Sequence, residues 1–106
     1  EYSDPKWSFA RVGTDNLVTE VKEKEVISQY ATVGIYLYSQ GCDFVNSAID
    51  MIVENDRVNN EFYTCPTYNY AIKNNARIGI YNIDYHQMHD IGTPEYLDIY
   101  LQLLSN

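Results

Sequence analysis

Basic residues are scarce in this 106-residue sequence, where seven Lys and Arg stand against 15 Asp and Glu and the formal net charge is −8. The sequence also contains no cluster of Lys and Arg. Nucleic acids and anionic membrane surfaces are bound through such clusters of basic side chains. The composition therefore disfavours both as partners of this chain.

Cysteines and long apolar runs are also scarce. No apolar run approaches the roughly 18 residues of a membrane-spanning helix. The two cysteines, Cys42 and Cys65, lack the Cys-x-x-Cys spacing of a metal site. We expect them to be reduced thiols of a cytoplasmic protein, while a disulfide between them stays an open alternative.

Proline and glycine are few, and apolar residues make up 45% of the chain, which favours a folded domain over a disordered one. The length is near the common size of one domain, so we expect a single domain over 1–106. Hydrophobic periodicity predicts four strands and three helices. The strands are expected at 7–12, 17–22, 31–38 and 76–82, and the helices at 43–55, at 66 to about 74, and from 94 to 104.

The order of these elements, β-β-β-α-α-β-α, predicts an α/β layer whose sheet has strands of mixed direction. The turn Gly13-Thr14-Asp15-Asn16 separates the first two strands and favours a hairpin with a four-residue loop. The third strand, 31–38, is almost wholly apolar, as expected of a strand covered on both faces. Such a small sheet has an exposed edge, so we expect self-association, or pairing with a missing part of the same protein.

A loop followed by a helix start lies between His86 and Leu97. Thr93 suits the N-cap and Pro94 suits the first helical position. Asp90 then lies on a short loop before a helix N-terminus, where a carboxylate can bind a cation or lie near a phosphate ester. The same residues also make a good loop-to-helix turn without any ligand.

Four short phrases carry a resemblance to a known family: Val21-Lys22-Glu23-Lys24, Ala31-Thr32-Val33-Gly34-Ile35-Tyr36, Asn60-Glu61-Phe62-Tyr63 and Met88-His89-Asp90-Ile91-Gly92-Thr93-Pro94-Glu95. In this order they resemble the C-terminal, sugar-binding half of the sugar-1-phosphate nucleotidyltransferases, over nearly the whole chain. These enzymes join a nucleoside triphosphate to a sugar 1-phosphate and release pyrophosphate. The phrases look most like bacterial members that serve capsule or surface polysaccharide synthesis.

The resemblance implies a Rossmann-like fold of the nucleotide-diphospho-sugar transferase type and two catalytic residues. Lys24 would hold the sugar phosphate as a flexible point charge, unless it is an ordinary solvated lysine. Asp90 would be one of two carboxylates that bind Mg²⁺, the cofactor of the complete enzyme, unless it only caps its turn.

The resemblance also implies four substrate-binding residues. Glu23 and Glu61 would accept hydrogen bonds from sugar hydroxyls, although surface glutamates are common. Gly34 would let the sugar approach the backbone, with Tyr36 beside it. The alternative for Gly34 is a strand glycine that faces a bulky neighbour.

The family's Gly-rich phosphate loop, Gly-x-Gly-Thr-Arg followed by a lysine, does not occur in this sequence. We therefore expect a C-terminal portion that lacks the nucleotide-binding half and is inactive alone. Two alternatives stay open. One is a non-catalytic ligand-binding or dimerisation module of the same fold. The other is part of a glycosyltransferase, although the usual Asp-x-Asp metal motif is missing here.

Overall fold

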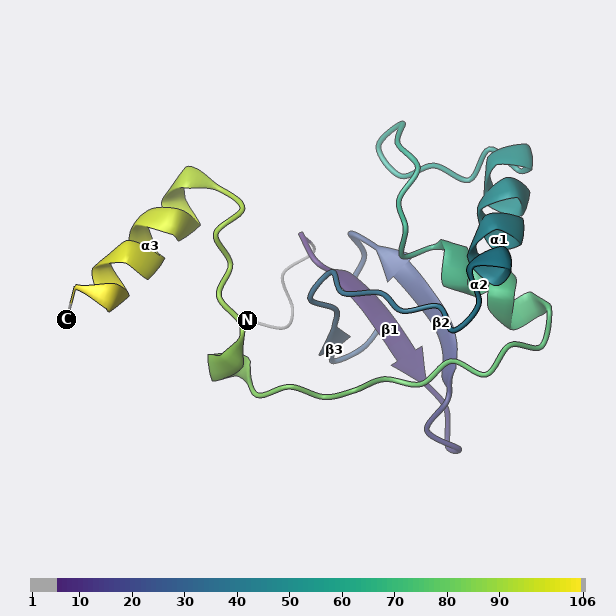
Figure 1. Cartoon of the computed structure of the whole chain (residues 1–106), viewed down its shortest axis with the longest axis horizontal. Coiled ribbons are helices and arrows are strands. Elements are labelled where there is room, and N and C mark those ends of the chain that lie inside the picture. Colours follow the sequence, from purple (N-terminus) through teal and green to yellow (C-terminus); the bar gives the residue numbers. More distant parts are fainter. Residues whose placement is uncertain (1–5, 106) are drawn as a thin grey trace.

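The computed structural model describes residues 6–105, which form a small antiparallel sheet, three α-helices and one turn of 3-10 helix (Figure 1). The strands are β1 (Ser8–Val12), β2 (Val18–Glu23) and β3 (Tyr30–Ala31), arranged in the order β2-β1-β3. The helices are α1 (Gly41–Val53), α2 (Thr67–Lys73) and α3 (Pro94–Leu104), and the 3-10 turn η1 spans Tyr85–Gln87.

The predicted hairpin of β1 and β2 is confirmed, with a loop of five residues instead of four. Val12 pairs with Val18, whereas the preceding Arg11 pairs with Glu20, so β2 carries one extra residue at a bulge. Because of this extra residue, Val18 and Val21 both face the core although they are three positions apart. Simple alternation along the sequence could not predict that pattern.

The strand predicted for 31–38 is wrong beyond its first residue, since β3 is only two residues long. In the described part of the chain, the following segment has no strand partner. Tyr36 and Tyr38 pack against the core, whereas Ile35 and Leu37 are each 85% exposed. This segment is therefore covered on one face rather than two, and an apolar run forms a sheet strand only where another strand pairs with its backbone.

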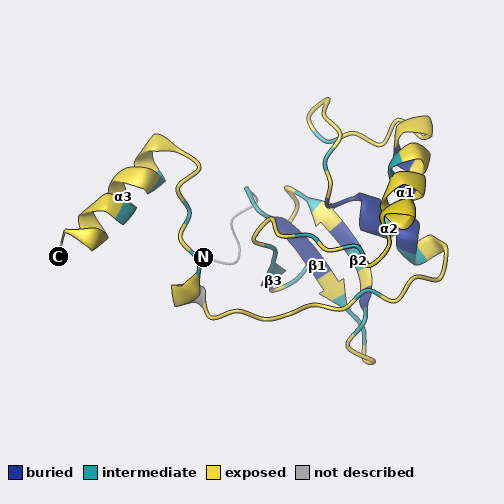
Figure 2. Ribbon diagram, viewed as in Figure 1, coloured by how far each residue is buried: buried dark blue, intermediate teal, exposed yellow. Residues whose placement is uncertain are grey.

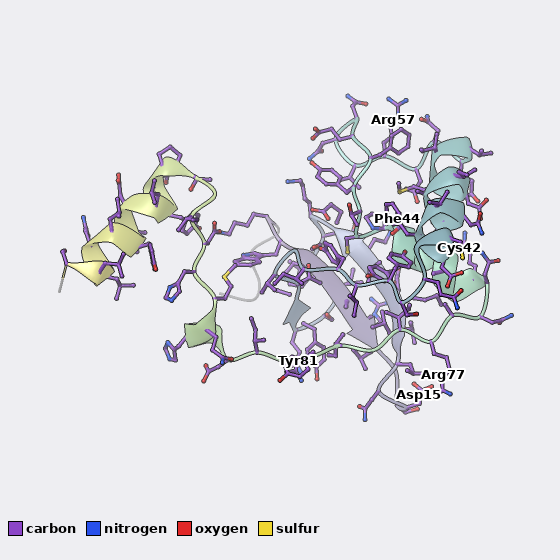
Figure 3. The ribbon with its side chains drawn as sticks, in the orientation of Figure 1. Asp15, Cys42, Phe44, Arg57, Arg77 and Tyr81 are labelled. Carbon is purple, nitrogen blue, oxygen red and sulfur yellow. The ribbon has the colours of Figure 1, made fainter. Side chains whose placement is uncertain are left out.

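The strand predicted for 76–82 is also wrong within residues 6–105. This segment crosses beside the sheet, where Val18 donates its backbone N–H to the carbonyl of Ile78 at 2.7 Å. Tyr81 of this segment, labelled in Figure 3, is 92% exposed. Both strand pairings are antiparallel, which corrects the predicted mixed-direction sheet and the predicted fourth strand.

The three helices are predicted correctly to within two residues at each end. Asn55 and Asn75 follow α1 and α2 with φ of 56° and 68°, the left-handed conformation that ends many helices. Thr93 is the N-cap of α3 and accepts the backbone N–H of Tyr96 at 3.3 Å, with Pro94 at the first helical position. These caps confirm the sequence prediction for the last helix.

The core lies between the sheet and the two central helices, where α2 packs against both β2 and α1. Figure 2 shows buried residues on β1, β2 and α2, whereas α3 has none. The buried apolar residues are Phe9, Ala10, Val18, Val21, Met51, Cys65, Tyr68, Tyr70 and Ala71.

Helix α3 stands apart from this core at the end of a long extended segment (Figure 1). The radius of gyration is 15.3 Å, against about 13 Å for a compact chain of this length. Among residues 6–105, no helix combines the length and the apolar character that a bilayer crossing requires.

Candidate functional site

A hollow of about 390 Å³ opens where β1 begins and β2 ends, and we call it the strand-end pocket. Antiparallel pairing of Ser8 with Glu23 brings the two strand ends together. Four of the six predicted site residues line this pocket although they are far apart in the sequence. They are Glu23, Gly34, Tyr36 and Asp90.

A cluster of three hydroxyl groups forms one wall of the pocket. Tyr36 Oη lies 2.7 Å from Ser8 Oγ and 2.8 Å from Thr32 Oγ1, and the Ser8 and Thr32 hydroxyls are also hydrogen-bonded to each other. Burial raises the pKa of Tyr36 to about 12, so its phenol stays neutral and can donate. Burial also raises the pKa of the neighbouring Cys65 thiol, which disfavours the reactive thiolate.

Glu23 and Lys24 lie at the end of β2. Burial raises the pKa of Glu23, an effect that the positive charge of Lys24 partly opposes. Lys24 has a φ of 58°, which is uncommon for a residue with a side chain. Its side chain is exposed and does not line the pocket, but its ammonium lies 5.4 Å from the ring centroid of Tyr63, which does. Lys24 is therefore a residue of the pocket's rim.

Gly34 lines the pocket, whereas Glu61 lies outside its wall. Gly34 has a φ of +82°, and a Cβ built there would meet nothing within 4 Å, so it faces open space rather than a bulky neighbour. A ligand could therefore approach its backbone closely. The Glu61 carboxylate accepts a hydrogen bond from the phenol of Tyr63, which lines the pocket, with 2.8 Å between Oε1 and Oη.

Asp90 joins the pocket from the loop before α3 and pairs with a residue that the sequence did not single out. Lys6 Nζ lies 3.3 Å from Asp90 Oδ2 and 3.4 Å from the ring centroid of Tyr96. Although desolvation lowers it, hydrogen bonds to Tyr96 and Asp90 raise the pKa of Lys6 above its ordinary value. The segment before α3 is thus held to the start of β1 by a charged contact.

A magnesium site is not assembled by the described residues. The second oxygen of Asp90, Oδ1, accepts the backbone N–H of Gly92 at 3.0 Å, so both carboxylate oxygens already have partners. Within 6–105, no three His, Cys, Asp or Glu side chains come close enough together to bind a metal ion. Asp90 offers a hard oxygen ligand of the kind Mg²⁺ prefers, but these residues alone do not fit the ion.

Lys6, Trp7, Ser8 and Thr32 belong to the pocket but were not predicted as site residues from the sequence. One signal could have indicated Lys6, Trp7 and Ser8: in an antiparallel hairpin, the residues at the start of the first strand lie beside the end of the second strand. Because Glu23 ends β2, the pairing of Ser8 with Glu23 places the start of β1 next to it.

Comparison with known proteins adds one finding on the fold. No protein-family model and no curated protein matches this chain. The crystal structure of a nucleoside-diphosphate-sugar pyrophosphorylase from Vibrio cholerae RC9 matches with a TM-score of 0.86 and 24% sequence identity. The chain shares the fold of that enzyme. The match covers 92% of this chain and 42% of the other, so this chain spans less than half of its neighbour's length.

Proposed function

We propose that this chain is the C-terminal, sugar-phosphate-binding portion of a nucleotidyltransferase. The complete enzyme would make a nucleoside-diphosphate sugar from a nucleoside triphosphate and a sugar 1-phosphate, with release of pyrophosphate. The observation that carries the proposal is the presence of Glu23, Gly34, Tyr36 and Asp90 around one pocket. The fold shared with the V. cholerae pyrophosphorylase supports the same class of chemistry.

The pocket's groups complement a phosphorylated sugar. A carboxylate such as that of Glu23 accepts hydrogen bonds from sugar hydroxyls, and the hydroxyl cluster around Tyr36 can both donate and accept. The ammonium groups of Lys6, on the wall, and Lys24, on the rim, supply positive charge for the phosphate. Glu61 would act from the rim on a sugar hydroxyl.

The reaction would be attack of a sugar-phosphate oxygen on the α-phosphorus of the nucleotide. The protein contributes positioning and charge neutralisation to such a transfer rather than covalent chemistry. Lys24 would hold the phosphate, while the wall residues Glu23, Gly34 and Tyr36 would position the sugar. This division makes Lys24 a catalytic residue, together with Asp90, and makes Glu23, Gly34 and Tyr36 substrate-binding residues.

Further polypeptide would have to supply the triphosphate site. The exposed apolar side chains of Ile35, Leu37 and Tyr81 lie on extended segments that lack strand partners within residues 6–105. Strands from a nucleotide-binding half could pair there and cover them. The isolated chain would then have no turnover, and the complete enzyme would work in the cytoplasm to supply surface polysaccharide synthesis.

Mg²⁺ would be bound only in the complete enzyme. Asp90 would contribute one carboxylate, and the remaining ligands would come from outside this chain. An ion at Asp90 would also have to displace the ammonium of Lys6, which lies 3.3 Å from Oδ2.

The contact of Lys6 with Asp90 favours a second candidate function, a non-catalytic module that binds a sugar phosphate without metal. In that case Asp90 would be the partner of a lysine and no more. The two candidates differ in whether the protein that contains this chain releases pyrophosphate.

The test is a pyrophosphate-release assay on the product of the complete gene, with a panel of nucleoside triphosphates and sugar 1-phosphates plus Mg²⁺. We expect release by the wild type and a loss of about 100-fold or more in Lys24→Ala and Asp90→Asn, the range for removing one charge-stabilising group. Lys73→Ala is the matched control, since Lys73 lines a separate hollow of about 540 Å³. Absence of release with every substrate pair, despite a folded protein that binds sugar 1-phosphate, would favour the non-catalytic module.

A further inference from the structure

Tyr63 lines the strand-end pocket and contacts two predicted site residues that lie at its rim. Its phenol donates a hydrogen bond to the Glu61 carboxylate, with 2.8 Å between Oη and Oε1. The Lys24 ammonium lies 5.4 Å from the centroid of its ring, within range of a cation–π interaction. Tyr63 therefore connects a carboxylate and an ammonium group, which are distant in sequence, to the wall of one pocket.

A tight turn fixes the backbone just before Tyr63. Val58 and Glu61 exchange two backbone hydrogen bonds of 2.9 and 3.0 Å, and Asn59 and Asn60 form the loop between them. These asparagines have φ of 51° and 64°, and two consecutive positive φ angles are typical of a type I′ turn, in which asparagine is favoured. The paired backbone holds Glu61 in place at the rim of the pocket.

The backbone after Tyr63 is anchored to α2. The carbonyl of Thr64 accepts the backbone N–H of Thr67 at 3.1 Å and its hydroxyl at 2.6 Å. Phe62 has a partner of its own, because the guanidinium carbon of Arg57 lies 4.9 Å from its ring centroid. Tyr63 thus belongs to a segment that is held at both ends, as a residue that positions other groups requires.

The phenol of Tyr63 keeps its proton in this environment. The hydrogen bond to Glu61 raises the pKa of Tyr63, and desolvation and the charges of Glu61 and Glu23 act in the same direction. At neutral pH the phenol is therefore a donor. A carboxylate has acceptor positions beyond the one that Tyr63 occupies, so Glu61 can still accept a hydrogen bond from a sugar hydroxyl.

We propose that Tyr63 is a positioning residue for sugar 1-phosphate binding, which holds the Glu61 carboxylate and the Lys24 ammonium at the mouth of the strand-end pocket. The inference rests on the proposed function and deepens it. The phenol O–H directs Glu61 toward the sugar, and the ring keeps Lys24 beside the phosphate.

The two contacts use different parts of one side chain, so two variants separate them. We would titrate the whole chain with glucose, galactose and mannose 1-phosphates and with inorganic phosphate, following backbone amide shifts by NMR. Tyr63→Phe removes the O–H and keeps the ring, so we expect it to weaken the best-bound sugar 1-phosphate about 3- to 10-fold and to leave inorganic phosphate unchanged. Tyr63→Leu also removes the ring, so we expect it to weaken inorganic phosphate about 2- to 5-fold as well.

The control and the outcomes separate this inference from the proposed function. Tyr81→Phe, at a position that is 92% exposed, should keep wild-type affinities. Wild-type affinity of Tyr63→Phe for the sugar 1-phosphate, or equal weakening of both ligands, would overturn the role of Tyr63 and leave the proposed function standing. Absence of sugar 1-phosphate binding by the wild type would contradict the proposed function, and the inference with it.

A variant at the exposed Glu61 covers the case in which a Tyr63 variant fails to fold. Glu61→Ala should weaken the sugar 1-phosphate by at least the factor expected for Tyr63→Phe, without weakening inorganic phosphate. In the Glu61→Ala background, Tyr63→Phe should cause no further loss, because both changes remove the same contact. Wild-type affinity of Glu61→Ala, or a full further loss in the double variant, would also overturn the inference.

Discussion

The phenol of Tyr36 connects three parts of the chain that are distant in sequence. The phenol is hydrogen-bonded to Ser8 on β1 and to Thr32 just after β3. The Tyr36 ring packs in a tilted arrangement against the ring of Tyr68 on α2, with 5.9 Å between the two ring centroids. A single side chain thus joins the pocket wall to the core. Residues of this kind affect both stability and ligand binding when they are changed.

Tyr36→Phe should lower the free energy of unfolding by about 1 kcal/mol, because it removes a shared hydrogen-bond partner while keeping the ring. Urea denaturation followed by circular dichroism would measure the change. Tyr81→Phe should stay within about 0.5 kcal/mol of wild type, since Tyr81 is a surface residue. Equal stability of Tyr36→Phe and wild type would contradict a structural role for the hydroxyl cluster.

Glu23 gives a prediction on pH. Its pKa is raised in the folded state, so the folded protein binds this proton more tightly than the unfolded chain does. Stability from this group is fully present below its ordinary pKa of 4.5 and is lost as the pH rises through the raised value. Glu23→Gln, which stays neutral, should therefore melt at a higher temperature than wild type at pH 7, with the difference vanishing near pH 4.

Thermal melts across this pH range would measure the difference. Glu20→Gln serves as a control, because this glutamate lies on the same strand outside the strand-end pocket and pairs with Arg11. A constant difference between Glu23→Gln and wild type across the range would contradict the effect of burial on Glu23. The same variant should bind sugar 1-phosphate more weakly, which would be an exchange of function for stability.

At the scale of elements, the parts predicted correctly are those set by local chemistry. The hairpin and three helices follow from turn residues, caps and periodicity, as Thr93 and Pro94 of α3 illustrate. The segment 31–38 was predicted as a strand because its composition is apolar and β-branched, and 76–82 because apolar residues alternate along it. Local sequence shows that a segment is able to form a strand. A strand also needs a neighbouring backbone to pair with, and the presence of that neighbour depends on distant parts of the chain.

Helix α3 depends on its own caps, because none of its residues is buried. Isolated helices of about its length are marginal in water. Thr93→Ala removes the side chain that accepts the N–H of Tyr96, and N-cap losses of this kind cost about 1 kcal/mol. We expect α3 to lose helicity while the core stays folded.

Amide NMR resonances of α3 and of α2, compared between Thr93→Ala and wild type, would separate the two effects. Thr14→Ala, in the exposed loop of the hairpin, is a control that should leave α3 unchanged. An intact α3 in the Thr93 variant would mean that contacts such as Lys6 with Tyr96 hold the helix without its cap.

For the molecule as a whole, exposed apolar surface is the dominant feature. Ile35 and Leu37 are each 85% exposed, beside a sheet whose outer strand β3 is two residues long. Surfaces of this kind pair with other chains, although a net charge of −8 opposes association at low salt. The sequence predicts an exposed sheet edge, but which residues would remain uncovered could not be predicted from it.

We predict that the chain self-associates at high concentration and that Leu37→Lys shifts it toward monomer. The lysine adds charge and a desolvation cost at the uncovered segment. Sedimentation velocity over a concentration series would measure the shift. Asp15→Asn in the hairpin loop, which raises the net charge by the same one unit as Leu37→Lys, is the control for net charge. A wild type that is strictly monomeric at the highest concentration would contradict this prediction.

An NMR titration of the whole ¹⁵N-labelled chain with sugar 1-phosphates would test directly whether the strand-end pocket binds this class of ligand. We expect saturable shifts of the backbone amides of Glu23, Gly34 and Tyr36, with little change along the outer face of α1. Shifts confined to the other hollow beside Lys73, or no shifts with any sugar 1-phosphate, would contradict the claim that the strand-end pocket binds this class of ligand.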